Sequence, residues 1–178
     1  MKLHEATALI RNPTFQMEHP QFWCDLGCGS GTFTVALAQS LASGSTIHAV
    51  DLDKGMLEGI SDQYHGVTIR KVLGDLTSPS LRLPSVDGIL MANSLHFIQD
   101  QDLLLRKLLP VTKCFLIVEY ERSKRSPWVP YPVGFERLFQ LFGALGVQHV
   151  EKMATRRLQN QARRCPAHCF PRASNIRG

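Results

Sequence analysis

Three aspartates in this 178-residue chain follow apolar runs, and glycines gather around the first of them. Asp25 precedes a loop in which glycine alternates with small residues: Gly27, Cys28, Gly29, Ser30 and Gly31. Asp51 and Asp75 follow the runs 46–50 and 67–73, directly or after one glycine. Glycine tolerates positive φ and lets backbone N–H groups come close to a ligand. The pattern predicts a site where backbone amides and carboxylates meet one ligand.

The surroundings of the glycine loop argue against a phosphate-binding site. No Lys-Ser/Thr pair follows the glycines, which excludes a P-loop, and Thr32 stands where the dinucleotide-binding pattern needs Gly or Ala. No lysine or arginine lies between Glu18 and Asp53, so no cation is close enough in sequence to neutralise a pyrophosphate. A carboxylate at the end of the second strand can accept both hydroxyls of a ribose. The charge balance therefore favours S-adenosylmethionine, which carries an ammonium and a sulfonium, over NAD.

Each of these residues also has a purely structural interpretation. The glycine loop could be only a tight strand-to-helix turn. Asp51 or Asp53 could cap the helix that follows, and capping does not exclude a ligand. Asp75 could serve only the turn after Gly74. Cys28 could be a small space-filling residue, which we favour over a reactive thiol.

Apolar runs alternate with helical periodicity along most of the chain. Strands are expected at residues 21–26, 46–50, 67–73, 88–92, 114–118 and 147–153. Helices are expected at residues 3–11, 32–42, 56–60, 100–109 and 135–144. Such alternation indicates right-handed crossovers and parallel strands. We therefore expect an α/β fold with a Rossmann-like, doubly wound, mostly parallel sheet flanked by helices, which binds ligands beyond the carboxyl ends of its strands.

The alternating pattern stops near the end of the chain. Residues 151–178 hold seven basic side chains and one acidic one, whereas residues 1–150 hold 13 basic and 14 acidic ones. We expect residues 1–153 to form the domain and residues 154–178 an irregular basic tail. A last antiparallel strand is therefore doubtful, and its absence would leave backbone edges open. Open edges predict marginal stability or a homo-oligomer formed through the sheet edge.

Four segments resemble, in order, the motif series of class I S-adenosylmethionine-dependent methyltransferases: WCDLGCGSGTFTVALAQ, HAVDLD, GDL and ILMANSLHF. The resemblance covers about residues 20–120. It implies that the glycine loop holds the methionine and ribose parts of the cofactor, with Asp25 near the amino group, usually through water. It also implies that Asp51 accepts the ribose hydroxyls and that Leu52 lies beside the adenine. The other cofactor-binding residues that it implies follow the third and fourth strands: Gly74, Asp75, Leu76, Asn93, Ser94 and Leu95.

The acceptor side is less specific in sequence. Methyl transfer from a sulfonium needs alignment above all, and a base only where the acceptor must lose a proton. His96 is the candidate catalytic residue for that proton, and a packing or capping role is equally open. Glu119 and Tyr120 could line the acceptor pocket, and the Pro-rich residues 120–134 could cover it. Residues 93–96 (NSLH) replace the Asn/Asp-Pro-Pro-Tyr of methyltransferases that act on base amines or glutamine, which favours a small organic acceptor.

Composition limits the class of protein. The hydrophobic share of 44% and the charged share of 20% are those of an ordinary globular domain. No apolar run is long enough to span a membrane, and five cysteines suit reduced thiols in a cytoplasmic protein. No cysteines and histidines have convincing zinc-site spacing, so no metal is expected. The basic tail leaves an RNA methyltransferase open, and the intact motifs leave open a module that binds S-adenosylmethionine without catalysis.

Overall fold

The computed structural model describes residues 1–11, 18–112, 114–157 and 164–171. Its strands are β1 (Phe22–Leu26), β2 (Thr46–Asp51), β3 (Gln63–Tyr64), β4 (Val67–Leu73), β5 (Gly88–Ala92), β6 (Cys114–Val118), β7 (Glu151–Arg157) and β8 (Arg164–Pro171). Its helices are α1 (Leu3–Ile10), α2 (Thr32–Ala38), α3 (Lys54–Glu58), α4 (Gln101–Leu108) and α5 (Phe135–Ala144), with a 3₁₀ turn at Leu95–Phe97. In the described part of the chain, no helix has the length and apolar character needed to cross a membrane.

One sheet with the strand order β3-β4-β2-β1-β5-β6-β8-β7 organises the fold. β4, β2, β1, β5 and β6 are parallel, whereas β3 pairs antiparallel with β4 and β8 pairs antiparallel with both β6 and β7. The chain moves outward from β1 to β2 and β4, and then returns to β5 on the other side of β1. This arrangement confirms the Rossmann-like, mostly parallel α/β fold. It also places the point where strand order reverses between β1 and β5, where such folds bind ligands.

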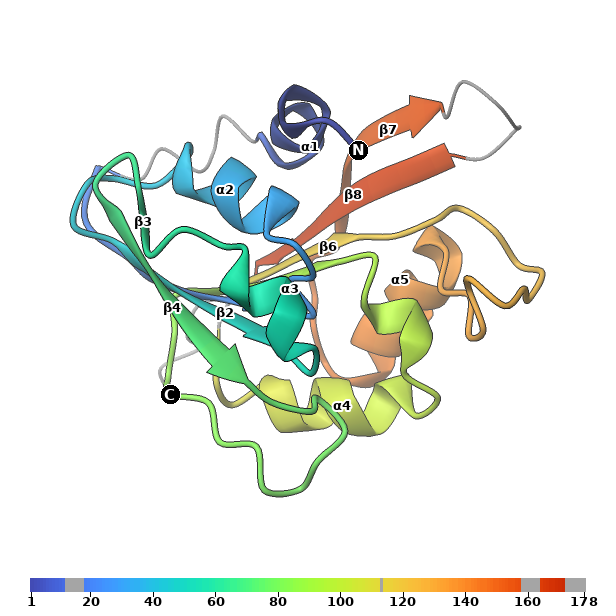
Figure 1. Ribbon diagram of the computed structural model, residues 1–178. Coiled ribbons are helices and arrows are strands. Elements are labelled where there is room, and N and C mark those ends of the chain that lie inside the picture. Colours follow the sequence, from blue (N-terminus) through green and yellow to red (C-terminus); the bar gives the residue numbers. More distant parts are fainter. Residues whose placement is uncertain (12–17, 113, 158–163, 172–178) are drawn as a thin grey trace, which may run out of the picture.

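Both faces of the sheet are covered, α1 and α2 lying on one side and α4 and α5 on the other (Figure 1). Successive residues of a strand point to opposite faces, so β1 contributes to two cores. Trp23 packs with side chains of α1 and α2, while Cys24 and Leu26 pack with side chains of α4 and α5. This burial on both faces explains why β5 is apolar throughout and why Asp25 is the one charged residue of β1.

The expectation of an irregular tail after residue 153 is wrong for the residues that the structure describes there. The expected boundary at 153/154 falls inside β7, and β8 lies between β6 and β7 with Leu116 opposite Cys169. The last antiparallel strand, β8, is therefore present and pairs with β6. The open edge of β6, from which marginal stability or a homo-oligomer was predicted, is thus covered. The sequence concealed β8 because Pro166 lies within it and Pro171 ends it, and proline is uncommon inside a sheet. Its position depends on backbone pairing with neighbours rather than on its own pattern.

Gly88 shows how closely β1 and β5 are packed. A Cβ at this position would lie 2.3 Å from Cη2 of the buried Trp23 side chain, and 2.5 Å from two other ring atoms. The indole is also held by its Nε1, which donates a hydrogen bond to Oε1 of Gln21 (2.8 Å). Gly88→Ala should therefore lower the free energy of unfolding by about 2 kcal/mol, as overpacked cores do. Urea unfolding measures the change.

Gly143, near the end of α5, provides the matched control. A Cβ added there would have no atom within 4 Å, and its helical position favours alanine over glycine. Gly143→Ala should raise the free energy of unfolding by up to about 1 kcal/mol. Equal effects of the two substitutions would contradict the tight contact between Gly88 and Trp23.

Candidate functional site

A cavity of about 540 Å³ opens where the described strands β1, β2, β4 and β5 end. This volume lies within the range of small-molecule sites in proteins. Most of the residues that the sequence implicated line it: Gly27, Cys28, Gly29, Ser30, Asp51, Leu52, Gly74, Asp75, Leu76, Asn93 and Ser94. Four of the cofactor-binding and catalytic candidates do not: Asp25, Gly31, Leu95 and His96. Glu119 and Tyr120, which were expected at the acceptor pocket, do not line it either. The sheet therefore gathers eleven of the fifteen cofactor-binding and catalytic candidates around one space.

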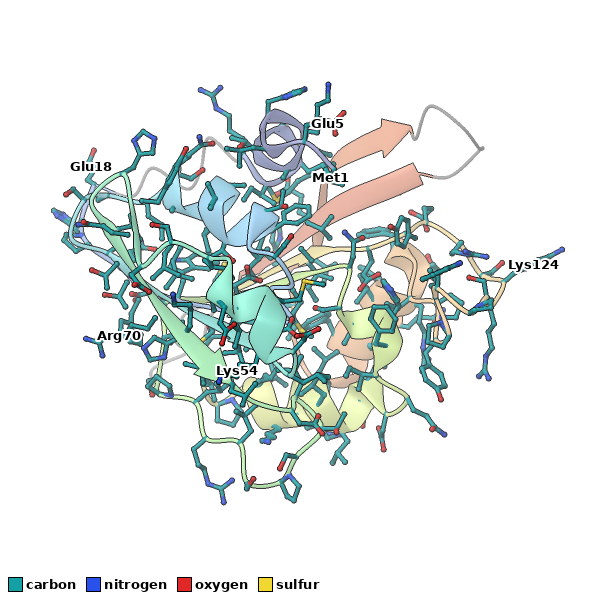
Figure 2. All side chains as sticks on the ribbon, viewed as in Figure 1. Met1, Glu5, Glu18, Lys54, Arg70 and Lys124 are labelled. Carbon is teal, nitrogen blue, oxygen red and sulfur yellow. The ribbon has the colours of Figure 1, made fainter. Side chains whose placement is uncertain are left out.

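Six lining residues were not expected from the sequence: Met1, Thr32, Phe33, Ala92, Phe97 and Ile98. Three exposed apolar side chains mark the rim, since Leu52, Phe97 and Met1 are 74%, 56% and 50% exposed. Phe97 is the last residue of the motif ILMANSLHF and Ile98 follows it, so extending the residues that were given roles, 93–96, by two would have found both. Met1 gave no signal, because it lines the cavity from a part of the sequence distant from the glycine loop. Figure 2 shows it at the start of α1.

The glycines of the loop serve three different purposes. Gly27 has φ +75°, and a Cβ there would lie 2.5 Å from Cβ of Ser94, so glycine lets the segment after β5 approach. Gly29 has φ +53°, and a Cβ there would meet no atom within 4 Å. Gly31 is the left-handed N-cap of α2, where a Cβ would lie 2.9 Å from Ile60. Gly31 is therefore a packing residue, and Gly29 is the glycine that leaves space at the cavity.

Asp51 is built into the loop. Its Oδ2 accepts a hydrogen bond from the Gly29 N–H (2.7 Å), and its Oδ1 accepts one from the Asp53 N–H (2.9 Å). Asp53 is the residue that caps α3, since its side chain accepts from the N–H groups of Gly55 and Met56. A carboxylate has about four lone-pair sites, so Asp51 is held in place by two donors and can accept two more.

Asp75 combines a turn with a place in the cavity lining. Its Oδ1 accepts hydrogen bonds from the Thr77 N–H (2.8 Å) and the Thr77 hydroxyl (2.7 Å). These hydrogen bonds lower the pKa of the Asp75 carboxyl. The side chain is therefore an oriented acceptor, next to the buried Leu76.

Asp25 lies behind the loop and is fully buried. Its Oδ2 accepts a hydrogen bond from the Thr34 hydroxyl (2.6 Å), whereas Oδ1 has no partner among the described residues. Burial raises the pKa of Asp25 to about 7; the Thr34 hydrogen bond opposes this, and the nearby Asp51 charge adds to it. Asp25 thus has a hydrogen-bond acceptor that a ligand or a water behind the loop could use.

Cys28 lines the cavity without the properties of a reactive thiol. It is buried, and burial, followed by the charges of Asp25 and Asp51, raises the pKa of its thiol. A thiol that stays protonated is a poor nucleophile. The structure agrees with a small space-filling role for Cys28.

His96 does not line the cavity, and its side chain pairs with Glu119. Its Nδ1 lies 2.6 Å from Oε2 of Glu119, and its backbone N–H donates to Oε1 of the same carboxyl (3.1 Å). Both side chains are buried. The centroid of the imidazole lies 4.3 Å from the ring centroid of Phe97, a lining residue, and 5.7 Å from that of Tyr120. His96 is therefore one side chain away from the cavity.

The loop at residues 120–134 is attached to this region at Tyr131. The Tyr131 N–H donates to the carbonyl oxygen of His96 (3.0 Å), and its hydroxyl donates to Oε1 of Gln99 (3.1 Å). Trp128 is 79% exposed, so it does not tuck beneath the loop. Lys124 lies at the outer end of the loop and points away from the sheet (Figure 2).

These features define a class: a Rossmann-like domain with a cavity of small-molecule size at its topological switch point, lined by a glycine loop and carboxylates. Comparison with known families specifies it further. The family described as "Methyltransferase domain" matches residues 24–114, about half of the chain. The chain belongs to this family, which confirms the resemblance seen in its motifs.

The individual relatives vary in how much of their length is matched. An uncharacterized protein of Haemophilus influenzae is 34% identical over 90 residues, which make up 47% of this chain and 31% of that protein. The chain thus spans about a third of that curated relative.

Solved structures resemble the whole chain more closely in shape than in sequence. The bifunctional kinase-methyltransferase WbdD has a TM-score of 0.72 at 17% identity, over 97% of this chain and 40% of WbdD. The magnesium protoporphyrin IX methyltransferase ChlM of Synechocystis PCC 6803, solved with bound S-adenosylmethionine, has a TM-score of 0.67 at 15% identity, over 96% of this chain and 78% of ChlM. At such identities the likeness shows the fold.

The buried Asp25 carboxyl should make stability depend on pH. Because its pKa is raised from 3.8 to about 7, the folded chain keeps a proton between these values that the unfolded chain has released. The contribution of this group to the free energy of unfolding therefore falls as the pH rises through this window, by as much as about 4 kcal/mol. Asp25→Asn removes this titration. Urea unfolding from about pH 4 to about pH 7 should show that the free energy of unfolding of Asp25→Asn rises relative to that of the wild type as the pH rises. A difference that stays constant with pH would exclude the raised pKa.

Proposed function

We propose that this domain transfers a methyl group from S-adenosylmethionine to a small organic acceptor. The observation that carries the proposal is the charge of the cavity: among the residues that the structure describes, its lining includes Asp51 and Asp75 and no lysine or arginine. The two carboxylates disfavour an anionic ligand such as a pyrophosphate there. A ligand with a sulfonium and an ammonium suits it, because opposite charges attract more strongly in a partly enclosed site than in water.

The cofactor is S-adenosylmethionine, and the shape of the site supports it. Asp51 accepts the ribose hydroxyls with the lone pairs that the loop amides leave free. Leu52 and Leu76 flank the adenine with apolar surface, and Asp75 accepts from its amino group. The methionine part lies along the loop where Gly29 leaves open space, and a Cβ would intrude there. The remaining residues at this end are the ones that the sequence implied: Gly27, Cys28, Ser30, Gly74, Asn93 and Ser94.

Asp25 acts on the cofactor from behind the loop. Its Oδ1 is buried without a partner among the described residues, and such an atom is costly unless something donates to it. The ammonium of the bound cofactor supplies donors, through a water where the distance requires one. Binding would then also favour the ionised form of Asp25.

The acceptor lies next to the methionine end of the cofactor, where β5 and β6 end. The segment Asn93–His96 lacks the Pro-Pro-Tyr of methyltransferases for planar amines, which supports a small organic acceptor. His96 takes the proton of an acceptor that must lose one, and Leu95, which is buried in the core, supports that segment from below.

RNA as the acceptor has less support. The basic segment that suggested it includes β8, which is paired on both sides within the sheet. Deleting residues 157–178 would remove that strand, so the deletion would test the fold rather than RNA binding. Salt dependence of RNA affinity in the intact chain is the suitable test.

Asp51→Ala tests the cofactor site. The substitution removes charge-assisted hydrogen bonds worth about 1.5–3 kcal/mol, so the dissociation constant for S-adenosylhomocysteine should rise by about 10- to 100-fold. Titration calorimetry measures it. Asp62→Ala, which removes an exposed carboxylate paired with Lys71 outside the cavity, should leave the affinity unchanged. An unchanged affinity in Asp51→Ala, or binding of NAD in place of S-adenosylhomocysteine, would contradict the proposal.

Incubation with methyl-labelled cofactor separates an enzyme from a binding module. With pooled small metabolites as acceptors, label should pass from the cofactor into new small molecules. Affinity for S-adenosylhomocysteine with all label remaining in the cofactor would indicate a module that binds without catalysis.

A further inference from the structure

A buried histidine–glutamate pair joins the carboxyl ends of β5 and β6. The side chains of His96 and Glu119 are 2% and 1% exposed, and the pair is 2.6 Å apart. Removing two polar groups from water is expensive, and apolar residues of similar volume would pack at least as well. Packing alone therefore does not explain why both residues are polar.

The hydrogen bonds of Glu119 determine which nitrogen of His96 carries a proton. Oε1 accepts from the His96 backbone N–H, which can only donate, and Oε2 faces Nδ1. With the carboxyl ionised, Oε2 can only accept, so Nδ1 must carry the hydrogen. The neutral imidazole then has its lone pair on Nε2.

Glu119 engages Nδ1 and leaves Nε2 as the ring nitrogen available to a further partner. Among the described residues, two side-chain atoms are fully buried without a hydrogen-bond partner, Asp25 Oδ1 and Nε2 of His48. Nε2 of His96 is not one of them, although the ring makes its hydrogen bond through Nδ1. The ring also packs against Phe97, which lines the cavity. The ring is therefore fixed in orientation one side chain from the cavity, and an acceptor that gives its proton to Nε2 must enter beside Phe97.

We propose that Glu119 is a positioning residue that holds His96 with Nε2 unprotonated, and that the acceptor is a hydroxyl compound whose proton passes to Nε2. The proposal rests on the function proposed above. The acceptor oxygen bonds to the methyl carbon as the carbon–sulfur bond of the donor breaks, and that electron pair stays on sulfur. The hydroxyl proton moves to Nε2, and the resulting imidazolium is stabilised by the Glu119 carboxylate. The products are a methyl ether, S-adenosylhomocysteine and one proton.

The base favours a hydroxyl over other acceptors because of their acidity. A neutral amine attacks with its own lone pair and can lose its proton afterwards. A thiol has a pKa near 8.5, so a useful fraction is already ionised at neutral pH. A hydroxyl group is much less acidic and becomes a good nucleophile only as its proton is taken, a contribution worth about 100- to 10,000-fold in rate.

Imidazole ¹⁵N NMR tests the role of Glu119 without an acceptor. In the wild type, with the ring neutral, the His96 signals, assigned by their loss in His96→Asn, should show Nδ1 protonated and Nε2 unprotonated. Glu119→Gln keeps the shape but offers one accepting and one donating atom, so the ring should switch to the Nε2–H form. A wild-type ring protonated on Nε2 would overturn the proposal even if Glu119→Gln failed to fold.

Product analysis tests the acceptor class. Methyl-labelled cofactor is supplied with three pools of small compounds that carry hydroxyls, amines or thiols. Label should appear in methyl ethers, and Glu119→Gln should reduce its rate by about 100-fold or more while the dissociation constant for S-adenosylhomocysteine changes less than about 2-fold. Asp102→Asn, which removes one carboxylate from an exposed ion pair with Arg106, should leave the rate unchanged.

The outcomes separate this inference from the function on which it rests. Label only in amines or thiols, or ether formation that Glu119→Gln leaves unchanged, would overturn the inference and leave methyl transfer standing. Affinity for the cofactor without label in any pool would overturn the proposal of a hydroxyl acceptor. It would also contradict the proposal that the domain transfers a methyl group. A chain that does not bind S-adenosylhomocysteine would refute the proposed function itself.

Discussion

The pairing of β1 between β2 and β5 is the constraint on which the site depends. Asp25 is opposite Ala49 on β2 and opposite Leu90 on β5, and all three strands run in the same direction. Their carboxyl ends therefore come level, and the segments after them meet in one place. The contact between Gly27 and Ser94 is a direct result, since no side chain larger than hydrogen fits where the two segments approach. The cavity exists because the sheet brings these ends together.

The three aspartates at this edge are accommodated in three different ways. Asp51 receives backbone N–H donors from the glycine loop and from Asp53, and Asp75 receives both donors of Thr77. Asp25 is buried with one hydroxyl donor among the described residues, and burial raises the pKa of its carboxyl. Among the described residues no lysine or arginine side chain lines the cavity, although the charge of Lys107 contributes to the lowered pKa of Asp75. The negative charge of these carboxylates favours a cationic ligand.

Local sequence patterns predicted most of the central sheet because those strands are buried on both faces. The run Gly88–Ala92 forms β5 with the expected bounds, and Phe135–Ala144 forms α5 in the same way. The pattern failed for β8, whose position comes from pairing with β6 and β7. It also missed the two-residue strand Gln63–Tyr64, which is too short to show a period. The periodicity of a sequence reflects which side chains are buried. The positions of β8 and of Gln63–Tyr64 depend instead on the strands with which they pair.

The candidate site divides along the same line. Glycines and aspartates at strand ends could be identified because their chemistry depends on their own position, and most of them line the cavity. The partner of His96 could not be identified from spacing, because Glu119 is 23 residues away and meets it only through the register of β5 and β6.

Asp25 and Glu119 show what that register accomplishes. Both carboxyls are fully buried, but Asp25 has one donor and an oxygen without a partner, whereas Glu119 faces a backbone N–H and an imidazole nitrogen. Because one oxygen of Asp25 has no hydrogen-bond donor among the described residues, a donor of a ligand can bind there. Both oxygens of Glu119 are engaged, so this carboxyl fixes His96 and acts through the imidazole that it holds.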